Sequence, residues 1–356
     1  MTVHQDLLDN TIAAIQPPDA IVTAAALARQ DQLTKPRGSL GRLELLGVQL
    51  AGIQRRVTPV IRDPLVVVAA GDHGIAAEGV SAFPQEVTGQ MILNFVAGGA
   101  AINVLARSAG ARLMVLDAGS RAEIDEQPGL RVRRIRPGTG NFAREPAMTR
   151  AEALAAIAFG LEVASEEAAN GTDLIAVGEM GIANTTAASA VVAAFTGRPV
   201  VEVTGRGTGV DDAAWRHKCE VIAAALELHA VDLDDPLSVL MAVGGLEIAA
   251  LAGVIVGAAS AGVPVLLDGF ITGAAALTAY HLAPAVRPYM IAAHRSVEPG
   301  HRIVLETLGL EPLFDLGLRL GEGSGAALAI PMVRSAAAIL TEMATFESAS
   351  VSQSET

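Results

Sequence analysis

Leu65-Val66-Val67-Val68-Ala69-Ala70-Gly71-Asp72-His73-Gly74 is the stretch that decides the fold class. Its unbroken apolar run predicts a strand that is buried on both faces, and the glycines and polar residues after it predict a turn. Five other segments repeat this arrangement of a short apolar run followed by glycine or a polar side chain: Arg112–Leu116, Asp173–Val177, Pro199–Val203, Val263–Leu267 and Tyr289–Ala293. The chain is therefore expected to contain six buried strands.

Helical patterns separate these strands, as in Gly99–Ala109, Arg150–Asn170 and Asn184–Phe195. Strands that alternate with helices predict an α/β fold in which a mostly parallel sheet is covered by helices on both faces. Ligands of such sheets bind at the carboxyl ends of the strands, where the strand order reverses. Asp, His, Glu and Gly residues follow the predicted strands, so we expect a ligand site at that edge.

Both ends of the chain have helical patterns. The patterned segments are Ala20–Arg29, Leu40–Arg55, Gly300–Leu308, Glu311–Leu320 and Ser324–Met343. We expect residues 1–62 and 297–356 to form a small helical domain beside an α/β domain of residues 63–296. The cationic loop Thr34–Arg42 is expected to end in a Ser39 N-cap. It is either a plain connection or a place where Lys35, Arg37 or Arg42 meets an anion.

Composition excludes several classes of protein. The net charge of −13 over 356 residues argues against a nucleic-acid binder, although it leaves room for a local cationic pocket. The single cysteine, Cys219, excludes an internal disulfide and a four-cysteine zinc site, which favours a reducing cytoplasm. Met1–Asn10 lacks a basic n-region, so no signal peptide is expected. We interpret the uncharged segment Ile248–Leu267 as a buried helix, turn and strand, not as a membrane span.

The segment Arg319–Ile330 (RLGEGSGAALAI) combines glycines with a carboxylate and a hydroxyl. Glycines allow tight turns and close approach of a ligand, and the helix N-terminus that follows offers unpaired N–H groups. Glu322 and Ser324 either cap this helix, or Glu322 presents its carboxylate to a ligand. A dinucleotide fingerprint fits poorly, because no complete βαβ unit fits before residue 356.

Two glycine loops could hold a phosphate through backbone N–H groups, without a metal. Gly178–Gly181 and Gly205–Gly209 each follow a predicted strand, and Arg206 and Lys218 are close to the second loop in the sequence. The alternative is ordinary glycine turns with solvated basic side chains. We expect no metal and no cofactor, since zinc spacings, a P-loop and a G-x-S-x-G motif are not found in the sequence.

Seven segments together resemble one enzyme family. They are Lys35–Glu44 (KPRGSLGRLE), Gly71–Gly74, Gly178–Thr186 (GEMGIANTT), Val243–Leu246 (VGGL), Pro264–Phe270 (PVLLDGF), Pro284–Tyr289 (PAVRPY) and Arg319–Ala329 (RLGEGSGAALA). In this order they resemble nicotinate-nucleotide–dimethylbenzimidazole phosphoribosyltransferases. The resemblance implies a Rossmann-like sheet with a small helical domain, a homodimer, and transfer of phosphoribose from nicotinate mononucleotide to 5,6-dimethylbenzimidazole. The product would be α-ribazole 5′-phosphate.

The resemblance also implies roles for individual residues. Glu322 aligns with the catalytic carboxylate, and Lys218 aligns with a lysine near the phosphate. The remaining substrate-binding candidates are Glu179 and Gly181 on the nucleotide loop, Gly205 and Gly207 on the second glycine loop, Leu320, Ser81, Phe83 and Met91 around the base, and Gly321 and Gly323 beside Glu322. A non-catalytic nucleotide or sugar-phosphate binding protein, another base-specific phosphoribosyltransferase and, more weakly, an NAD(P) enzyme remain the alternatives.

The implied chemistry suits these residue types. Nicotinate bound through its ring nitrogen is a cationic pyridinium, so it leaves without a proton. The incoming benzimidazole must lose its N–H, so one general base is enough. A carboxylate in an apolar pocket has a raised pKa and suits this task near neutral pH. The flat base needs an apolar slot, which Phe83, Met180 and Leu320 could form.

Overall fold

The fold is built on one parallel sheet. The computed structural model describes residues 3–207, 209 and 211–352, and within them six strands form a single sheet in the order β3-β2-β1-β4-β5-β6. All neighbouring strands in it are parallel. The strands are β1 (Pro64–Gly71), β2 (Arg112–Gly119), β3 (Leu130–Val132), β4 (Leu174–Met180), β5 (Val265–Leu267) and β6 (Met290–Ala292). The predicted α/β class is confirmed, and the strand order reverses between β1 and β4.

The side chains of β1 divide the core in two. Leu65, Val67 and Ala69 point into one apolar cluster, and Val66, Val68 and Ala70 point into the other. The first cluster is formed with α1 (Val3–Ala14), α6 (Arg150–Ala169), α7 (Asn184–Thr196), α10 (Pro236–Val243), α11 (Leu246–Ser260) and α12 (Phe270–Leu282). The second is formed with α3 (Arg42–Gln54), α4 (Glu86–Ala97), α5 (Ala101–Ala109) and α14 (Ser324–Glu342). Burial on both faces explains the continuous apolar strand sequences.

The uncharged segment Ile248–Leu267 is interior, as its interpretation required. It comprises most of α11, a turn at Gly262 and strand β5. Helix α11 packs tightly on α6, where a Cβ on Gly160 would lie 1.9 Å from the carbonyl oxygen of Ala250. Only glycine allows the two helices to approach this closely.

One predicted strand is wrong. Pro199–Val203 contains the short helix α8 (Val200–Val203), and the sixth strand is instead β3 at the edge of the sheet. Val201 is 58% exposed, so this apolar run is not buried on two faces. Strand β3 escaped prediction because it has three residues, one of them Arg131.

Two expectations for the chain ends are also wrong. Residues 311–320 form no helix, and their backbone instead hydrogen-bonds to the chain just after β6, as in Arg295 N–H to Phe314 O at 2.9 Å. Gly41, not Ser39, precedes α3, and no side chain caps that helix. The side chain of Lys35 lies 2.7 Å from the Glu44 carboxylate, so this ion pair occupies it.

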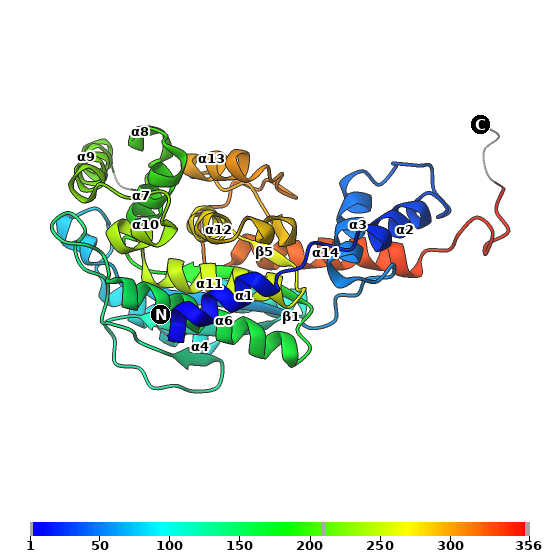
Figure 1. Ribbon diagram of the computed structural model, residues 1–356, viewed down its shortest axis with the longest axis horizontal. Helices are drawn as coiled ribbons and strands as arrows, with labels where there is room; N and C mark the ends of the chain where they lie inside the picture. Colours follow the sequence, from blue (N-terminus) through cyan, green and yellow to red (C-terminus); the bar gives the residue numbers. More distant parts are fainter. Residues whose placement is uncertain (1–2, 208, 210, 353–356) are drawn as a thin grey trace.

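Helices from the two chain ends meet away from the sheet. Helix α2 (Ala20–Gln30), α3 and the far end of α14 lie together at the right of Figure 1. They share a small core of Ala26, Val48, Ala51 and Leu340. Helix α1 packs on α6, and α13 (Pro299–Leu308) packs on α12. The small domain that we propose is therefore centred on α2, α3 and the end of α14. The remaining elements are α9 (Asp212–His229) and the 3-10 turns η1 (Gly74–Glu78) and η2 (Pro284–Tyr289).

Two helical segments are long and apolar enough to cross a membrane by length and composition alone. Glu86–Ala109 and Ser324–Glu342 have 39% and 56% of their most apolar windows buried. The first segment comprises α4 and α5, which are separated at Gly98, where φ is 81°. The second is α14, whose buried residues belong to the core beside the sheet. Core helices of this kind pass the same test, so neither segment is evidence of a span.

Candidate active site

A cavity of about 410 Å³ opens at the carboxyl ends of β4, β5 and β6. The sequence pattern predicted a ligand site at these carboxyl ends. The lining residues include apolar side chains, carboxylates, one arginine, several polar side chains and four glycines. They are Phe83, Val87, Met91, Glu179, Met180, Gly181, Ile182, Asn184, Thr185, Gly207, Gly269, Phe270, Ile271, His294, Ser296, Glu298, Arg319, Leu320, Gly321 and Glu322.

Glu322 lies on a tight glycine turn above β4. Gly321, Glu322 and Gly323 have φ values of 84°, 63° and 87°. The left-handed region is costly for a residue with a side chain, and such strain is typical of functional sites. A Cβ on Gly178 of β4 would lie 2.4 Å from the Glu322 carbonyl carbon. The turn therefore rests directly on the strand, which brings Glu322 to the cavity.

Asp268, which follows β5, caps helix α14. Its Oδ1 accepts hydrogen bonds from the backbone N–H groups of Gly325 and Ala326 at 2.7 and 3.0 Å. Its Oδ2 accepts the N–H of Gly323 at 3.1 Å. The interpretation of Glu322 and Ser324 as caps of this helix is therefore wrong, and Gly323 contributes its backbone to the turn instead of lining the cavity.

Of the three carboxylates that line the cavity among the described residues, Glu179 and Glu322 have different environments. Burial raises the pKa of Glu322, and a 3.4 Å hydrogen bond from the N–H of Ile102 to its Oε2 opposes this rise. Burial, with the charge of Asp268, raises the pKa of Glu179 to about 8, although Asn184 donates a hydrogen bond to it. Glu179 therefore keeps its proton at neutral pH. Two such carboxyl groups can divide the roles of hydrogen-bond donor and base.

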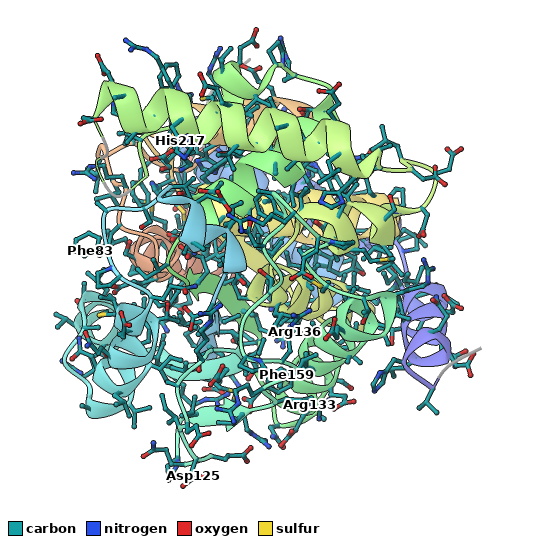
Figure 2. The ribbon with its side chains drawn as sticks, turned by 90° about the vertical axis from the view of Figure 1, so that its left-hand side faces the viewer. Phe83, Asp125, Arg133, Arg136, Phe159 and His217 are labelled. Atoms are coloured by element: carbon teal, nitrogen blue, oxygen red, sulfur yellow. The ribbon has the colours of Figure 1, made fainter. Side chains whose placement is uncertain are left out.

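The apolar end is formed by α4 and by the loops after β4 and before Glu322. Val87, Met91, Met180, Ile182 and Leu320 are among the lining residues. Phe83 and Leu320 are 52% and 56% exposed, so this end is open. Figure 2 shows Phe83 at the surface of the molecule. Ser81 is not among the lining residues, and its Oγ accepts the N–H of Phe83 at 3.4 Å.

A buried lysine, Lys218, lies behind the opposite end of the cavity and does not line it itself. Lys218 is 1% exposed, and its Nζ donates to Thr185 Oγ1 at 2.7 Å. Burial lowers its pKa to about 8, and the charge of Glu298 opposes this fall. Arg319 lines the cavity at the same end. Glu298 is close to both cations and also lines the cavity, so an anion at this end would meet two cations and one carboxyl group.

The Glu298 carboxylate already accepts a hydrogen bond from the second glycine loop, Gly205–Gly209. Its Oε1 accepts the N–H of Gly207 at 3.0 Å. Gly205 lies against the same carboxylate and lines an adjoining cavity of about 570 Å³ with Arg206 and Trp215. The N–H of Gly207 is therefore not free for a phosphate unless Glu298 releases it.

Comparisons with known proteins agree with this geometry. The profile of a family described as Phosphoribosyltransferase matches residues 15–351. The nicotinate-nucleotide–dimethylbenzimidazole phosphoribosyltransferase of Roseiflexus sp. (strain RS-1) is 58% identical, with 97% of this chain and 98% of the relative covered. The chain belongs to this phosphoribosyltransferase family. The protein of the same name from Desulforamulus reducens is 54% identical, with 98% of this chain and 99% of the relative covered.

Solved structures of the family have the same fold. The crystal structure of the phosphoribosyltransferase from Thermus thermophilus superposes with a TM-score of 0.89 at 50% identity. The superposition covers 94% of this chain and all of the other. The expected α/β fold of a phosphoribosyltransferase is thus shown by both the sheet and its relatives.

Sequence reasoning found only part of this phosphoribosyltransferase site. The cavity contains Glu322, Glu179, Gly181, Gly207, Phe83, Met91, Leu320 and Gly321 from the predicted set. It also contains Asn184, Thr185, Glu298 and Arg319, which had no assigned role. Asn184 and Thr185 belong to the GEMGIANTT motif, so their place after a buried strand was an available signal. Glu298 gave none, because a carboxylate before Pro299 resembles an ordinary helix start.

Metal ligands do not cluster in the described part of the chain. Over residues 3–207, 209 and 211–352, no group of three or more His, Cys, Asp or Glu side chains is placed to hold a metal ion. Asp211 and Asp212 are adjacent at the start of α9, where Asp211 Oδ1 accepts the N–H of Ala214 at 2.9 Å. That aspartate is a helix cap.

Proposed function

We propose that this protein transfers phosphoribose from nicotinate mononucleotide to 5,6-dimethylbenzimidazole, with Glu322 as the general base. The products are α-ribazole 5′-phosphate and nicotinate. One observation carries the proposal: the Glu322 carboxylate lies in a cavity that has apolar side chains for a flat base, and Arg319 and the Lys218–Thr185 pair are available at the cavity for a phosphate. The names of the relatives support the same reaction.

The reaction balances with a single base. One benzimidazole nitrogen forms a bond to C1′ of the ribose while the bond from C1′ to the pyridinium nitrogen breaks. The electron pair of the broken bond stays on the nicotinate nitrogen and neutralises the ring. The other benzimidazole nitrogen gives its proton to Glu322. Acid–base catalysis by a positioned side chain contributes about 10²–10⁴-fold.

We assign Glu179 the role of a neutral hydrogen-bond donor. Its pKa of about 8 means that it carries a proton at neutral pH. A protonated carboxyl can donate to a substrate hydroxyl without adding a second negative charge beside Glu322. Two ionised carboxylates there would instead repel each other and hold substrate anions away.

The phosphate is assigned to the end with Lys218, Thr185 and Arg319. Lys218 supplies a buried charge, Thr185 supplies a hydroxyl, and the N-terminus of α7 adds the positive end of a helix dipole. Gly181 and Asn184 line the cavity and are proposed to contact the nucleotide. Gly205 and Gly207 contribute to it only if the bond from Gly207 to Glu298 opens.

The deciding experiment is incubation with nicotinate mononucleotide and 5,6-dimethylbenzimidazole, followed by mass analysis. Equal amounts of the riboside phosphate and free nicotinate are expected. Binding of both compounds without product would favour a non-catalytic binding protein. Faster turnover with adenine in place of dimethylbenzimidazole would favour a phosphoribosyltransferase for another base.

We also propose that the protein acts without a metal or cofactor, as a homodimer in the cytoplasm. The reaction above requires no Lewis acid, so turnover should survive EDTA. Loss of turnover in EDTA that magnesium restores would contradict this. The exposed apolar residues Phe83 and Leu320 suit a site that a second copy covers. Analytical ultracentrifugation should give twice the mass of the 36.4 kDa chain.

A further inference from the structure

Thr88 is a fully buried hydroxyl that the proposed reaction does not use. It lies on α4 at 0% exposure, between Val87 and Met91, which line the apolar end of the cavity. Its Oγ1 accepts the backbone N–H of Ile182 at 3.1 Å. Ile182 belongs to the loop after β4 and lines the cavity as well. Thr88 therefore joins two walls of the site.

The same hydroxyl faces the turn after β1. Asp72 is 1% exposed, and its Oδ2 accepts the N–H of Arg121 at 2.8 Å. The Thr88 hydroxyl and this N–H both oppose the burial that raises the pKa of Asp72. Thr88 thus accepts from one loop and faces the carboxylate of another. A hydroxyl can donate and accept at once, which a purely apolar side chain cannot do.

A second tie connects the same wall to this turn. The side chain of Gln85, just before α4, donates from Nε2 to the carbonyl oxygen of His73 at 2.6 Å. The segment from Ser81 to Met91 carries Phe83, Val87 and Met91 to the cavity. It is therefore held at two points on the Asp72–His73 turn and at one point on the Ile182 loop.

We propose that Thr88 is a positioning residue that sets the width of the slot for the aromatic base. It fixes α4, with Val87 and Met91, against the loop that carries Met180 and Ile182. The inference rests on the proposed function for the identity of the base. It assigns Thr88 no contact with substrate, since its oxygen is occupied by Ile182 N–H.

Thr88→Val tests this inference, because valine keeps the volume and removes the hydroxyl. The buried N–H of Ile182 then lacks its acceptor, and the two walls lose their spacing. We expect KM for dimethylbenzimidazole to rise about tenfold, while KM for nicotinate mononucleotide changes little. Thr88→Ser keeps the hydroxyl and should restore most of the affinity for the base.

Thr278→Val is the matched control. Thr278 is also at 0% exposure, but its hydroxyl donates to Ala274 O at 2.9 Å within α12. This variant should lower the melting temperature while leaving both KM values unchanged. If Thr88→Val changes stability alone, as the control does, Thr88 is structural and the inference is wrong. Equal losses for both substrates would contradict it too.

Gln85→Leu covers the case in which Thr88→Val does not fold. Gln85 is half-buried, so its loss is easier to tolerate, and the same selective rise in KM for the base is expected. An unchanged KM for the base in this variant would overturn the inference. Calorimetric titration with dimethylbenzimidazole separates the two proposals. Wild-type protein without turnover would defeat the proposed function, whereas an unchanged base affinity in a folded Thr88→Val variant would defeat only the inference.

Discussion

At the scale of single residues, two buried carboxyl groups are proposed to have different roles. Glu179 is 6% exposed at the cavity and its raised pKa of about 8 favours the protonated form, whereas Glu322 accepts a hydrogen bond from the N–H of Ile102 at the start of α5. Replacing Glu322 by Gln preserves size and removes the ability to take a proton. Turnover should fall about 10²–10⁴-fold.

The same variant should keep its melting temperature, because Asp268 and not Glu322 caps α14. Single-turnover kinetics beside thermal melting measures both quantities. Wild-type turnover in a folded Glu322→Gln variant would remove Glu322 from the mechanism. Glu179→Gln is a useful comparison, since glutamine imitates a protonated carboxyl and should cost much less than Glu322→Gln.

If Lys218 holds the phosphate as proposed, substrate binding should depend on pH. Burial lowers its pKa to about 8, so the ammonium loses its charge as the pH rises through that value. KM for nicotinate mononucleotide should therefore rise above about pH 8, whereas KM for the uncharged base should not follow it. Lys218→Ala should weaken nicotinate mononucleotide binding and abolish this dependence. A flat profile between pH 7 and 9 in the wild type would place the phosphate elsewhere.

At the scale of elements, helix α14 depends on a residue of the loop after β5. Asp268→Ala removes the acceptor for three N–H groups of the Gly323–Ala326 turn. Loss of a helix cap costs about 0.5–2 kcal/mol of stability. Turnover should fall as well, since the turn that carries Glu322 is released.

The pH profile provides an additional test of Asp268. Its charge raises the pKa of both Glu179 and Glu322, so the acid limb of the kcat profile should move to lower pH in Asp268→Ala. Glu322→Gln should lower turnover without lowering the melting temperature. Asp268→Ala should lower both turnover and the melting temperature. An Asp268→Ala protein with wild-type melting would mean that the cap contributes nothing.

The elements could be predicted where local sequence decides them. β1 could be predicted because its unbroken apolar run matches a strand in which every residue is buried. α11 could be predicted because its apolar pattern is long. The failures depend on distant contacts. Residues 311–320 have a helical pattern, but the chain after β6 supplies their hydrogen-bond partners. The cap of α14 was missed for the same reason, since Asp268 lies far before it in sequence.

At the scale of the whole molecule, the site residues converge from segments far apart in sequence. Ile102 and Glu322 are separated by 220 positions, and Thr88 and Ile182 by 94. The pattern of strand ends predicted which edge of the sheet holds the site. It could not predict which side chains meet, because that depends on packing. The last family motif contains Glu322, the overall resemblance suggested Lys218, and the structure shows the contacts of both.

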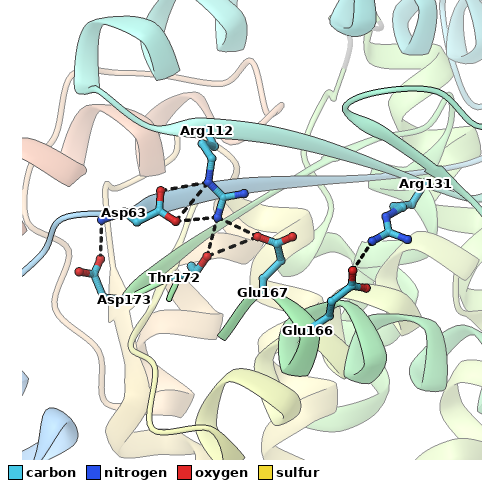
Figure 3. Close-up of polar contacts among 7 residues, drawn as sticks. All are labelled: Asp63, Arg112, Arg131, Glu166, Glu167, Thr172 and Asp173. Atoms are coloured by element: carbon cyan, nitrogen blue, oxygen red, sulfur yellow. Dashed lines mark hydrogen bonds and ion pairs between the residues drawn. The ribbon is translucent and has the colours of Figure 1, made fainter. Parts of the chain in front are cut away.

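An ionic network connects the amino-terminal ends of the strands, opposite the cavity (Figure 3). Arg112, the first residue of β2, donates to both carboxylate oxygens of Asp63, and its Nη2 donates to Thr172 Oγ1 at 2.7 Å. The same nitrogen lies 2.8 Å from Glu167, which is only 5% exposed. Asp63 directly precedes β1, Thr172 lies just before β4, and Glu167 is in the last turn of α6. The network therefore joins the amino-terminal edge of three strands, away from the cavity.

This division between the two edges predicts the effect of Arg112→Met. The variant keeps the apolar stem but leaves Glu167 buried without its cation. Partial exposure of the arginine limits the loss to roughly 1–3 kcal/mol of unfolding free energy. Both KM values and kcat should stay near wild type, since the active site lies at the carboxyl ends of the strands. Urea unfolding beside steady-state kinetics measures the two effects. Arg131→Met is the control, because its partner Glu166 is exposed and its removal should cost much less. A fall in kcat of Arg112→Met at unchanged stability would show that the two edges are coupled through the sheet.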